Sequence, residues 1–338
     1  MYKGTGISKD QLSDDGEPCI LYGELYTKYK SETIREVISK TNIDNTKLVR
    51  SKANDVIIPC SGETAEDIAT ARCVLNDNIL LGGDLNIIRL HGHDGSFMSY
   101  QLNGKRKYDI AKVAQGVSVV HLYGEHLKGV RTINPSFDEQ KKISSLLALL
   151  DERIATKNKI IDKLQSLIKG IADKLFQTAR TTKPLLEFAP NITSGTDKSG
   201  SGTIPLYGST GIIGTVKNAS QKGNIVLVAR VGTIGTVQYV NEPCGVSDNA
   251  LIVEAGEMTK YIYHFLKTYN FTRITSGTTQ PLITASSLKK AAIPTYDIES
   301  QTRIVLCLNG LEKKLDMAKQ YLSDIAVMKQ YLLRQMFI

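Results

Sequence analysis

The sequence contains one long segment twice. Residues 140–176 align without a gap to residues 301–337, so one constant offset relates the two copies. In each copy, alternating steps of four and three residues visit ten positions, of which nine are apolar. This is the heptad pattern of a coiled coil, and it predicts one long helix per copy. The predicted core positions are Ile143, Leu147, Leu150, Ile154, Ile161 and Leu164 in the first copy, and Ile304, Leu308, Leu311, Leu315, Leu322 and Ile325 in the second.

Both copies are suited to uninterrupted helix. Neither contains proline and each contains one glycine. Each apolar seam covers 33 residues, which is about 50 Å of helix at 1.5 Å per residue. Ser136 and Glu139 have the spacing of a capping box at the start of the first helix, and Pro294 precedes the second. We expect the two helices to pair antiparallel, because two copies of one unit are readily related by a pseudo-twofold axis.

The blocks before the two helices also resemble each other, more weakly. Residues 54–58 resemble residues 223–227, and residues 20–23 resemble residues 205–208. Both blocks hold short β-branched runs between glycine, asparagine and serine, which is typical of strands joined by turns. The predicted fold is therefore α+β, with two mostly β globular domains (1–135 and 180–293) separated by two long helices (136–179 and 294–338).

Composition limits the classes of protein that remain. The net charge is +8, which suits an anionic partner such as nucleic acid. The excess is clearest in residues 180–293, with 11 Lys and Arg against 6 Asp and Glu, whereas residues 1–135 carry 17 of each. No apolar run is long enough to span a membrane, and five scattered cysteines without CxxC spacing favour a reducing compartment over disulfides or zinc. We therefore expect a cytoplasmic protein.

Two motifs carry a resemblance to a known family. One is Ser276-Gly277-Thr278-Thr279-Gln280-Pro281-Leu282-Ile283, and the other is the helix opening Glu139-Gln140-Lys141-Lys142-Ile143 with its echo at residues 300–304. Together with residues 206–211 and 229–235, they make the chain similar to the DNA-specificity subunits of Type I restriction–modification systems over nearly its whole length.

The resemblance implies two target-recognition domains, each reading half of a split site in double-stranded DNA, with the helices as a spacer. It also implies two modification methyltransferase subunits and restriction (translocase) subunits as partners. S-adenosylmethionine, ATP and magnesium would belong to those partners, and the system would serve DNA methylation and host defence.

The chain departs from the family pattern at two places. The second block opens with a lead-in, Lys183-Pro184-Leu185-Leu186-Glu187-Phe188, that has no counterpart in the first block. Val119 stands where the second block has Gln280. The contacts of the first domain at that loop should therefore differ from those of the second.

Candidate DNA-binding residues are polar or basic side chains near turns. Base edges are read by Arg, Asn and Gln, while Lys and Arg neutralise phosphates. In the second domain the candidates are Ser209, Thr210, Arg230, Thr233, Asn249, Thr279 and Gln280, with Lys198, Lys217 and Lys222 for phosphates. In the first domain they are Lys3, Tyr22, Glu24, Ser61, Glu63, Lys105, Arg106 and Lys107.

We expect no catalytic residue and no metal site in this chain. Residues 134–137 resemble the catalytic motif of amino-methyltransferases but lack its second proline, and no phosphate-binding GxxxxGK[ST] loop is present. His91 and His93 flank a glycine, and no third ligand has recognisable spacing. Three alternatives remain open at this point: a stand-alone DNA-binding regulator, a recognition fragment of a DNA methyltransferase, and a coiled-coil scaffold.

Overall fold

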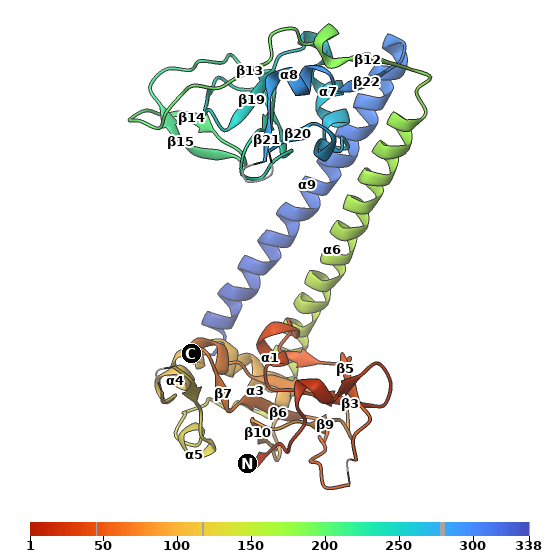
Figure 1. Cartoon of the computed structure of the whole chain (residues 1–338). Helices are drawn as coiled ribbons and strands as arrows, with labels where there is room; N and C mark the ends of the chain where they lie inside the picture. The colour runs from red at the N-terminus through yellow and green to blue at the C-terminus, as the bar shows by residue number, and fades with distance from the viewer. Residues whose placement is uncertain (45, 117, 278–280, 338) are drawn as a thin grey trace. The chain divides into compact units, whose positions relative to one another are not determined.

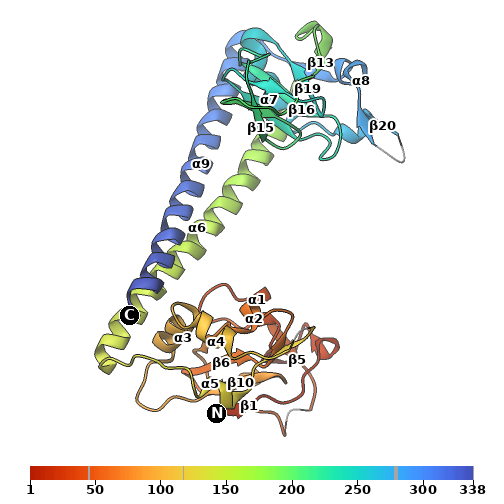
Figure 2. The same ribbon diagram turned by 90° about the vertical axis from the view of Figure 1, so that its left-hand side faces the viewer.

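The computed structural model describes residues 1–44, 46–116, 118–277 and 281–337 (Figures 1 and 2). The chain divides into two compact units. The first contains Met1–Lys159 and Gln320–Ile338, and the second contains Ile160–Lys319. Each unit therefore consists of one globular domain with half of each long helix. No helix among the described residues is long and apolar enough to cross a membrane.

Both predicted long helices are present, as α6 (Phe137–Gln177) and α9 (Ile298–Gln335). Ser136 and Glu139 form the predicted capping box, in which the Ser136 amide donates to the Glu139 carboxylate at 3.1 Å. In the second copy Asp297 accepts the Ser300 amide at 2.7 Å. The second helix begins later than its predicted segment, because Pro294 belongs to strand β22 (Ala292–Thr295).

The heptad seam is confirmed within each unit. In the first unit, Leu147 and Leu150 of α6 share a core with Ile325 and Leu333 of α9, so the start of one helix packs beside the end of the other. In the second unit, the end of α6 and the start of α9 share a core that includes Phe176 and Ile304. The helices therefore run antiparallel in both units. All twelve predicted core positions are buried or half-buried, while Leu146, Leu149, Ile160 and Leu167, which lie off the seam, are exposed.

Among its described residues, the first globular domain contains a sheet with the order β1-β10-β6-β8-β4, a sheet with the order β2-β5-β3-β9 and the strand pair β11-β7. Helix α3 packs against β6 and β8. The strands are β1 (Tyr2–Lys3), β2 (Leu12–Ser13), β3 (Glu17–Ile20), β4 (Thr33–Ile34), β5 (Ser39–Thr41), β6 (Asp55–Pro59), β7 (Ser61–Gly62), β8 (Arg72–Val74), β9 (Leu80–Leu81), β10 (Leu85–Ile88) and β11 (Val120–His121). The helices are η1 (Lys9–Gln11), α1 (Glu24–Thr27), α2 (Ala65–Ile68), α3 (Gly95–Asn103), α4 (Lys107–Lys112) and α5 (Gly124–Leu127).

The second globular domain repeats this plan. Its sheets have the orders β13-β19-β16-β17 and β15-β14-β18, with two further strand pairs, β12-β22 and β20-β21. Helix α7 packs against β16 and β17, as α3 packs against β6 and β8 in the first domain. The strands are β12 (Thr181–Pro184), β13 (Thr193–Ser194), β14 (Ile204–Tyr207), β15 (Ile212–Val216), β16 (Ile225–Ala229), β17 (Val237–Val240), β18 (Gly245–Val246), β19 (Ala250–Val253), β20 (Thr275–Ser276) and β21 (Leu282–Ile283). The helices are η2 (Leu185–Glu187), η3 (Gly256–Met258), α7 (Thr259–Leu266), η4 (Phe271–Arg273) and α8 (Ala285–Lys289).

Strand register corrects the sequence alignment of the two domains by one position. Pro59 pairs with Leu85 at the end of β6, and Ala229 pairs with Ala250 at the end of β16, so these two strand ends correspond. Asn54 then matches Asn224 rather than Gly223. Both asparagines have positive φ angles, 79° and 55°, which a short polar side chain tolerates. The correction matters because a slip of one position would move each side chain of the strand to the opposite face of its sheet.

Candidate nucleic-acid interface

In the second domain, Arg230 directly follows the buried strand β16, at a place where four segments meet. The Arg230 amide donates to the Asn249 carbonyl at 3.0 Å, and the Arg230 carbonyl accepts the Ile283 amide at 3.0 Å. The Ser209 hydroxyl donates to the Val231 carbonyl at 3.3 Å. These bonds bring together the turn after β14, the loop after β16, the turn after β18 and strand β21.

Several predicted readers therefore lie at one edge of the second domain. Ser209, Thr210, Arg230, Thr233 and Asn249 all belong to these segments and are exposed or half-buried. Thr279 and Gln280 lie outside the described residues, in the connection between β20 and β21. The structure thus assembles candidates from separate parts of the sequence, which is what a base-reading surface requires.

The loop after β16 has a backbone conformation that depends on two glycines. Gly232 and Gly235 both have positive φ angles, 71° and 80°, and a side chain at Gly235 would collide with the Phe271 ring. The Gly235 amide donates to the Ala229 carbonyl at 3.0 Å, which closes the loop. Within the described residues, the buried Nε of Arg230 has no hydrogen-bond partner. A guanidinium at this edge can donate to a guanine or a phosphate through its terminal nitrogens.

The three lysines predicted to contact phosphates do not join this edge. Lys217 follows Val216, which pairs with Ile204 at the start of β14. Lys222 precedes β16, whereas Arg230 follows it, so these two residues lie at opposite ends of a strand roughly 15 Å long. Lys198 is in the connection from β13 to β14, where the Gly200 amide donates to the Thr215 carbonyl at 2.9 Å. All three are exposed and lie away from Arg230 and Asn249.

The first domain has the same backbone arrangement with different side chains. The Cys60 amide donates to the Asp84 carbonyl at 2.7 Å, and the Cys60 carbonyl accepts the Leu122 amide at 2.7 Å. Leu122 and Ile283 are related by the same offset as the two helices, so Cys60 and Asp84 occupy the positions of Arg230 and Asn249. Burial raises the pKa of Cys60 to about 11, which keeps the thiol uncharged. Sequence reasoning did not select Cys60 or Asp84; the corrected strand register is the signal that finds them.

Other candidates of the first domain are spread over the surface. Ser61 donates to the Asp84 carboxylate at 3.2 Å, and Lys3 pairs with Asn86 on β10, so both lie beside the Cys60 edge. Glu63 is exposed in the turn after β7. Tyr22 lines a cavity of about 520 Å³ that also borders Asp84.

Glu24 has a structural role in that cavity wall. Its carboxylate is buried, accepts the Leu21 amide at 3.0 Å and pairs with Lys28 at 2.6 Å. It also accepts the Ser39 hydroxyl. These bonds occupy both carboxylate oxygens, so Glu24 supports the turn that carries Tyr22 and is poorly placed to contact DNA itself.

The basic cluster Lys105, Arg106 and Lys107 lies at the turn between α3 and α4. A side chain at the preceding Gly104 would stand 2.6 Å from the Leu333 carbonyl, so this turn contacts the end of α9. Arg106 pairs with Asp109 at 3.5 Å. The cluster is therefore beside the helices of its unit, apart from the Cys60 edge.

The structure also shows exposed apolar residues that sequence reasoning missed. Ile212 and Ile213 begin β15, directly after the turn that carries Ser209 and Thr210, and are 62% and 52% exposed. No sequence signal separates them from buried strand residues, because their exposure depends on what packs on that side of the hairpin.

No group of three or more His, Cys, Asp and Glu side chains that could hold a metal ion occurs in the described part of the chain. His93 contacts Gln140, with its Nδ1 3.1 Å from the Gln140 amide nitrogen, at the start of α6. This residue therefore takes part in the junction between the first domain and the helix.

Comparison with known proteins gives a consistent result. Residues 182–326 match the model of the Type I restriction modification DNA specificity domain. The specificity subunit of the Type I restriction enzyme MjaVIII from Methanocaldococcus jannaschii is 26% identical over 156 residues, which are 46% of this chain and 35% of that protein. The match thus covers about a third of the length of this relative.

Two solved structures share the fold. The crystal structure of the Type I restriction–modification S subunit from M. genitalium has a TM-score of 0.69 at 19% identity, covering 100% of this chain and 93% of that one. A structure described under complex assembly and conformational transition of the Type I R-M system has a TM-score of 0.51 at 13% identity, covering 89% and 86%. Residues 182–326 thus resemble the Type I restriction modification DNA specificity domain, and the whole chain shares its fold with a Type I specificity subunit of known structure.

Proposed function

We propose that this chain is the sequence-specific DNA-binding subunit of a Type I restriction–modification complex and reads a bipartite site, one half with each domain. The observation that carries the proposal is the repeated edge around Arg230 and Cys60. The same two backbone hydrogen bonds hold it in both domains, except that the side chains differ. Two copies of one framework with different side chains suit two half-sites of different sequence.

From the resemblance to Type I specificity subunits, we also propose that the chemistry belongs to partner subunits. Modification methyltransferase subunits would bind S-adenosylmethionine, and restriction subunits would use ATP and magnesium. We expect the purified chain to show no methyltransferase, nuclease or ATPase activity. Robust methyl transfer by the chain alone would contradict this division of labour.

The outward faces of the helices offer a place for two methyltransferase subunits. Ile160 and Leu167 on α6 are exposed, and so are Tyr321 and Met328 on α9. Tyr321 and Met328 are the counterparts of Ile160 and Leu167 in the second copy of the repeat. Large apolar residues exposed at repeated positions favour protein partners that bind twice in the same way. Ile160→Asp and Tyr321→Asp, each made separately, should each reduce the number of methyltransferase subunits that co-purify with the chain.

Selection of bound duplexes from a randomised pool tests DNA recognition by the full chain. We expect enriched sequences with two short defined elements and a constant gap. Enrichment of a single uninterrupted element would favour a stand-alone regulator, and no enrichment would overturn the proposal.

The helices would set the gap between the half-sites. Adding one heptad to both helices, after Lys159 and after Lys319, preserves the register of the seam. It adds about 10 Å of helix at 1.5 Å per residue. Since DNA rises about 3.4 Å per base pair, the selected gap should grow by roughly three base pairs while the half-sites stay the same. An insertion into only one helix should break the register and weaken folding. A doubly lengthened protein that folds, binds and selects the original gap would show that the helices do not set it.

A further inference from the structure

A buried polar cluster ties the first globular domain to both long helices. Asp151 on α6 accepts the Tyr100 hydroxyl at 2.7 Å and the Ser31 hydroxyl at 2.9 Å. Lys329 on α9 lies 2.5 Å from Asp151 and 2.5 Å from Glu32. Ser31, Glu32 and Tyr100 come from the globular domain, so three separate parts of the first unit meet at this cluster.

The cluster is unusual because its charges are buried. Lys329 and Glu32 are each only 7% exposed. Burial raises the pKa of Glu32, although Lys329 partly opposes that shift. Buried ion pairs of this kind add little net stability, because the cost of removing the charges from water offsets their attraction. Such pairs do fix the relative orientation of the segments that carry them, because hydrogen bonds between charged groups form only in one relative arrangement.

The other copy of the helix shows that a charge is not required at this seam position. Ile168 on α6 occupies the position in the first copy that Lys329 on α9 occupies in the second. Lys329 is thus a charged residue at a core position that the duplicated unit fills with an apolar one. Packing alone therefore does not explain why Lys329 is at this position.

The second unit has a related but more exposed contact. Glu312 is the counterpart of Asp151 in the second copy of the repeat. It pairs with Lys267, directly after α7, at 2.5 Å and lies 3.8 Å from His264. Lys267 is 39% exposed at its side chain, so this pair is screened by solvent and constrains the second domain less.

We propose that Lys329, Asp151 and Glu32 are positioning residues that fix the orientation of the first recognition domain on the helix pair, and thereby the distance at which its half-site is read. The proposal rests on the function proposed above. If the domain turned on the helices, Tyr100 and Ser31 would leave Asp151, and Lys329 would lose one of its two carboxylates. The alternative arrangement would leave buried charges unpaired, so the cluster disfavours it strongly.

The decisive variant removes the charges and keeps the shapes: Glu32→Gln, Asp151→Asn and Lys329→Met together. Thermal unfolding and selection from a pool of duplexes with randomised half-sites and gaps are measured on the full chain. We expect the variant to fold and to select the same two half-sites. Its preference for one gap over the neighbouring gaps should fall at least about tenfold, equivalent to about 1.4 kcal/mol.

If the triple variant does not fold, a single conservative substitution in the same cluster tests the proposal instead. Tyr100→Phe removes one hydroxyl that binds Asp151 and leaves the ring in place, and it should broaden the gap preference to a smaller extent. The matched control is Arg303→Gln, which removes a charge from an exposed pair on α9 and should change nothing. A triple or Tyr100→Phe variant that binds with the parental gap distribution would overturn the positioning role and leave the proposed function standing. A parent chain that selects no bipartite duplex would overturn both.

Discussion

The two globular domains share their backbone framework and differ in the side chains at its edge. In the second domain Arg230 and Asn249 stand where the first has Cys60 and Asp84, on backbones joined by the same hydrogen bonds. The second edge thus presents a guanidinium and an amide, and the first presents a neutral thiol and a carboxylate. A carboxylate can accept from cytosine, whereas arginine and asparagine suit guanine and adenine. The comparison teaches that the two copies keep one backbone framework and present different chemical groups at its edge.

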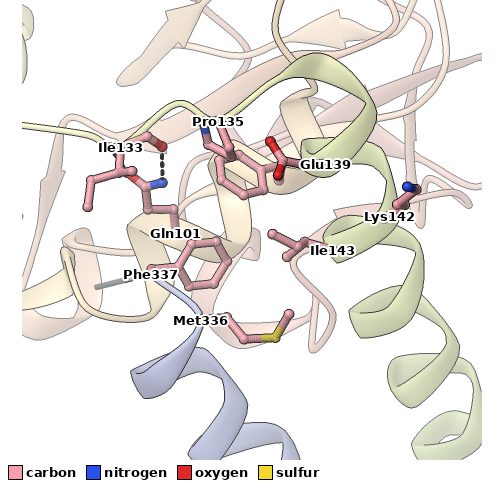
Figure 3. A pocket seen from close by; sticks show the side chains of 9 residues that line it. Gln101, Ile133, Pro135, Glu139, Lys142, Ile143, Met336 and Phe337 are labelled. Carbon is pink, nitrogen blue, oxygen red and sulfur yellow. Dashed lines mark hydrogen bonds between the residues drawn. The ribbon is translucent and has the colours of Figure 1, made fainter.

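The two domains also differ in the segment that leads into the following long helix. In the second domain β12 pairs with β22, and Ile293 is fully buried. The corresponding residues 131–134 of the first domain, which the structure describes, form no strand. Thr132, the counterpart of Ile293, is half-buried, and the next residue, Ile133, is 42% exposed. There Ile133 borders a cavity of about 350 Å³, together with Phe97, Pro135, Met336 and Phe337 (Figure 3). Among the described residues, this end of the first domain thus has a less completely covered core than the matching end of the second domain.

The largest effect on DNA recognition is expected when one whole globular domain is exchanged. Replacing residues 180–293 with the matching block of a relative should change one half-site completely and leave the other intact, since each framework carries its own edge. Mapping of methylated bases in cells that carry the exchanged chain and its partners measures the outcome. A change in both halves would mean that the two domains do not read independently.

The next largest effect is expected at the polar contacts between each globular domain and its helices, and it concerns the free energy of unfolding. Lys329→Ala leaves Glu32 and Asp151 buried without their cation and should cost about 3–5 kcal/mol of unfolding free energy. Lys267→Ala, at the more exposed contact of the second unit, should cost about 0–1 kcal/mol. Urea unfolding of the two variants side by side gives both values. Equal losses would contradict the difference in burial between the two contacts.

Substitutions at Arg230 and at its counterpart Cys60 should have different effects on DNA recognition. Arg230→Ala should weaken recognition of one half-site by about 1–3 kcal/mol, as expected for a bidentate base contact. Cys60→Ala, at the matching position, should leave both half-sites nearly unchanged, because a neutral thiol contributes little. Competition binding with duplexes altered in either half distinguishes the two. Uniform weakening on every duplex would instead assign Arg230 to a phosphate.

The smallest effect is expected at the exposed lysines of the second domain. Lys217→Ala should weaken binding to all duplexes alike and reduce the slope of log affinity against log salt by roughly one. Titrations at several salt concentrations, with the parent chain as reference, test this. An unchanged slope would remove Lys217 from the set of phosphate contacts.

The sequence by itself determined the helices and their pairing seam. A heptad pattern depends only on residues a few positions apart, so periodicity alone located Leu147, Leu150, Ile304 and Leu308 in the core. The start of the first helix followed in the same way from Ser136 and Glu139. The fold class and the family resemblance were also available at this level, because the repeat is gapless over the helices.

The tertiary structure decided which residues meet. Strand register is set by contacts between distant segments, so only the structure matched Cys60 with Arg230 and showed Glu24 to be buried. Glu32 and Asp151, the partners of Lys329, lie far from it in the sequence, and no local pattern connects the three. Burial and partner choice depend on how sheets and helices pack together, which local sequence spacing does not encode.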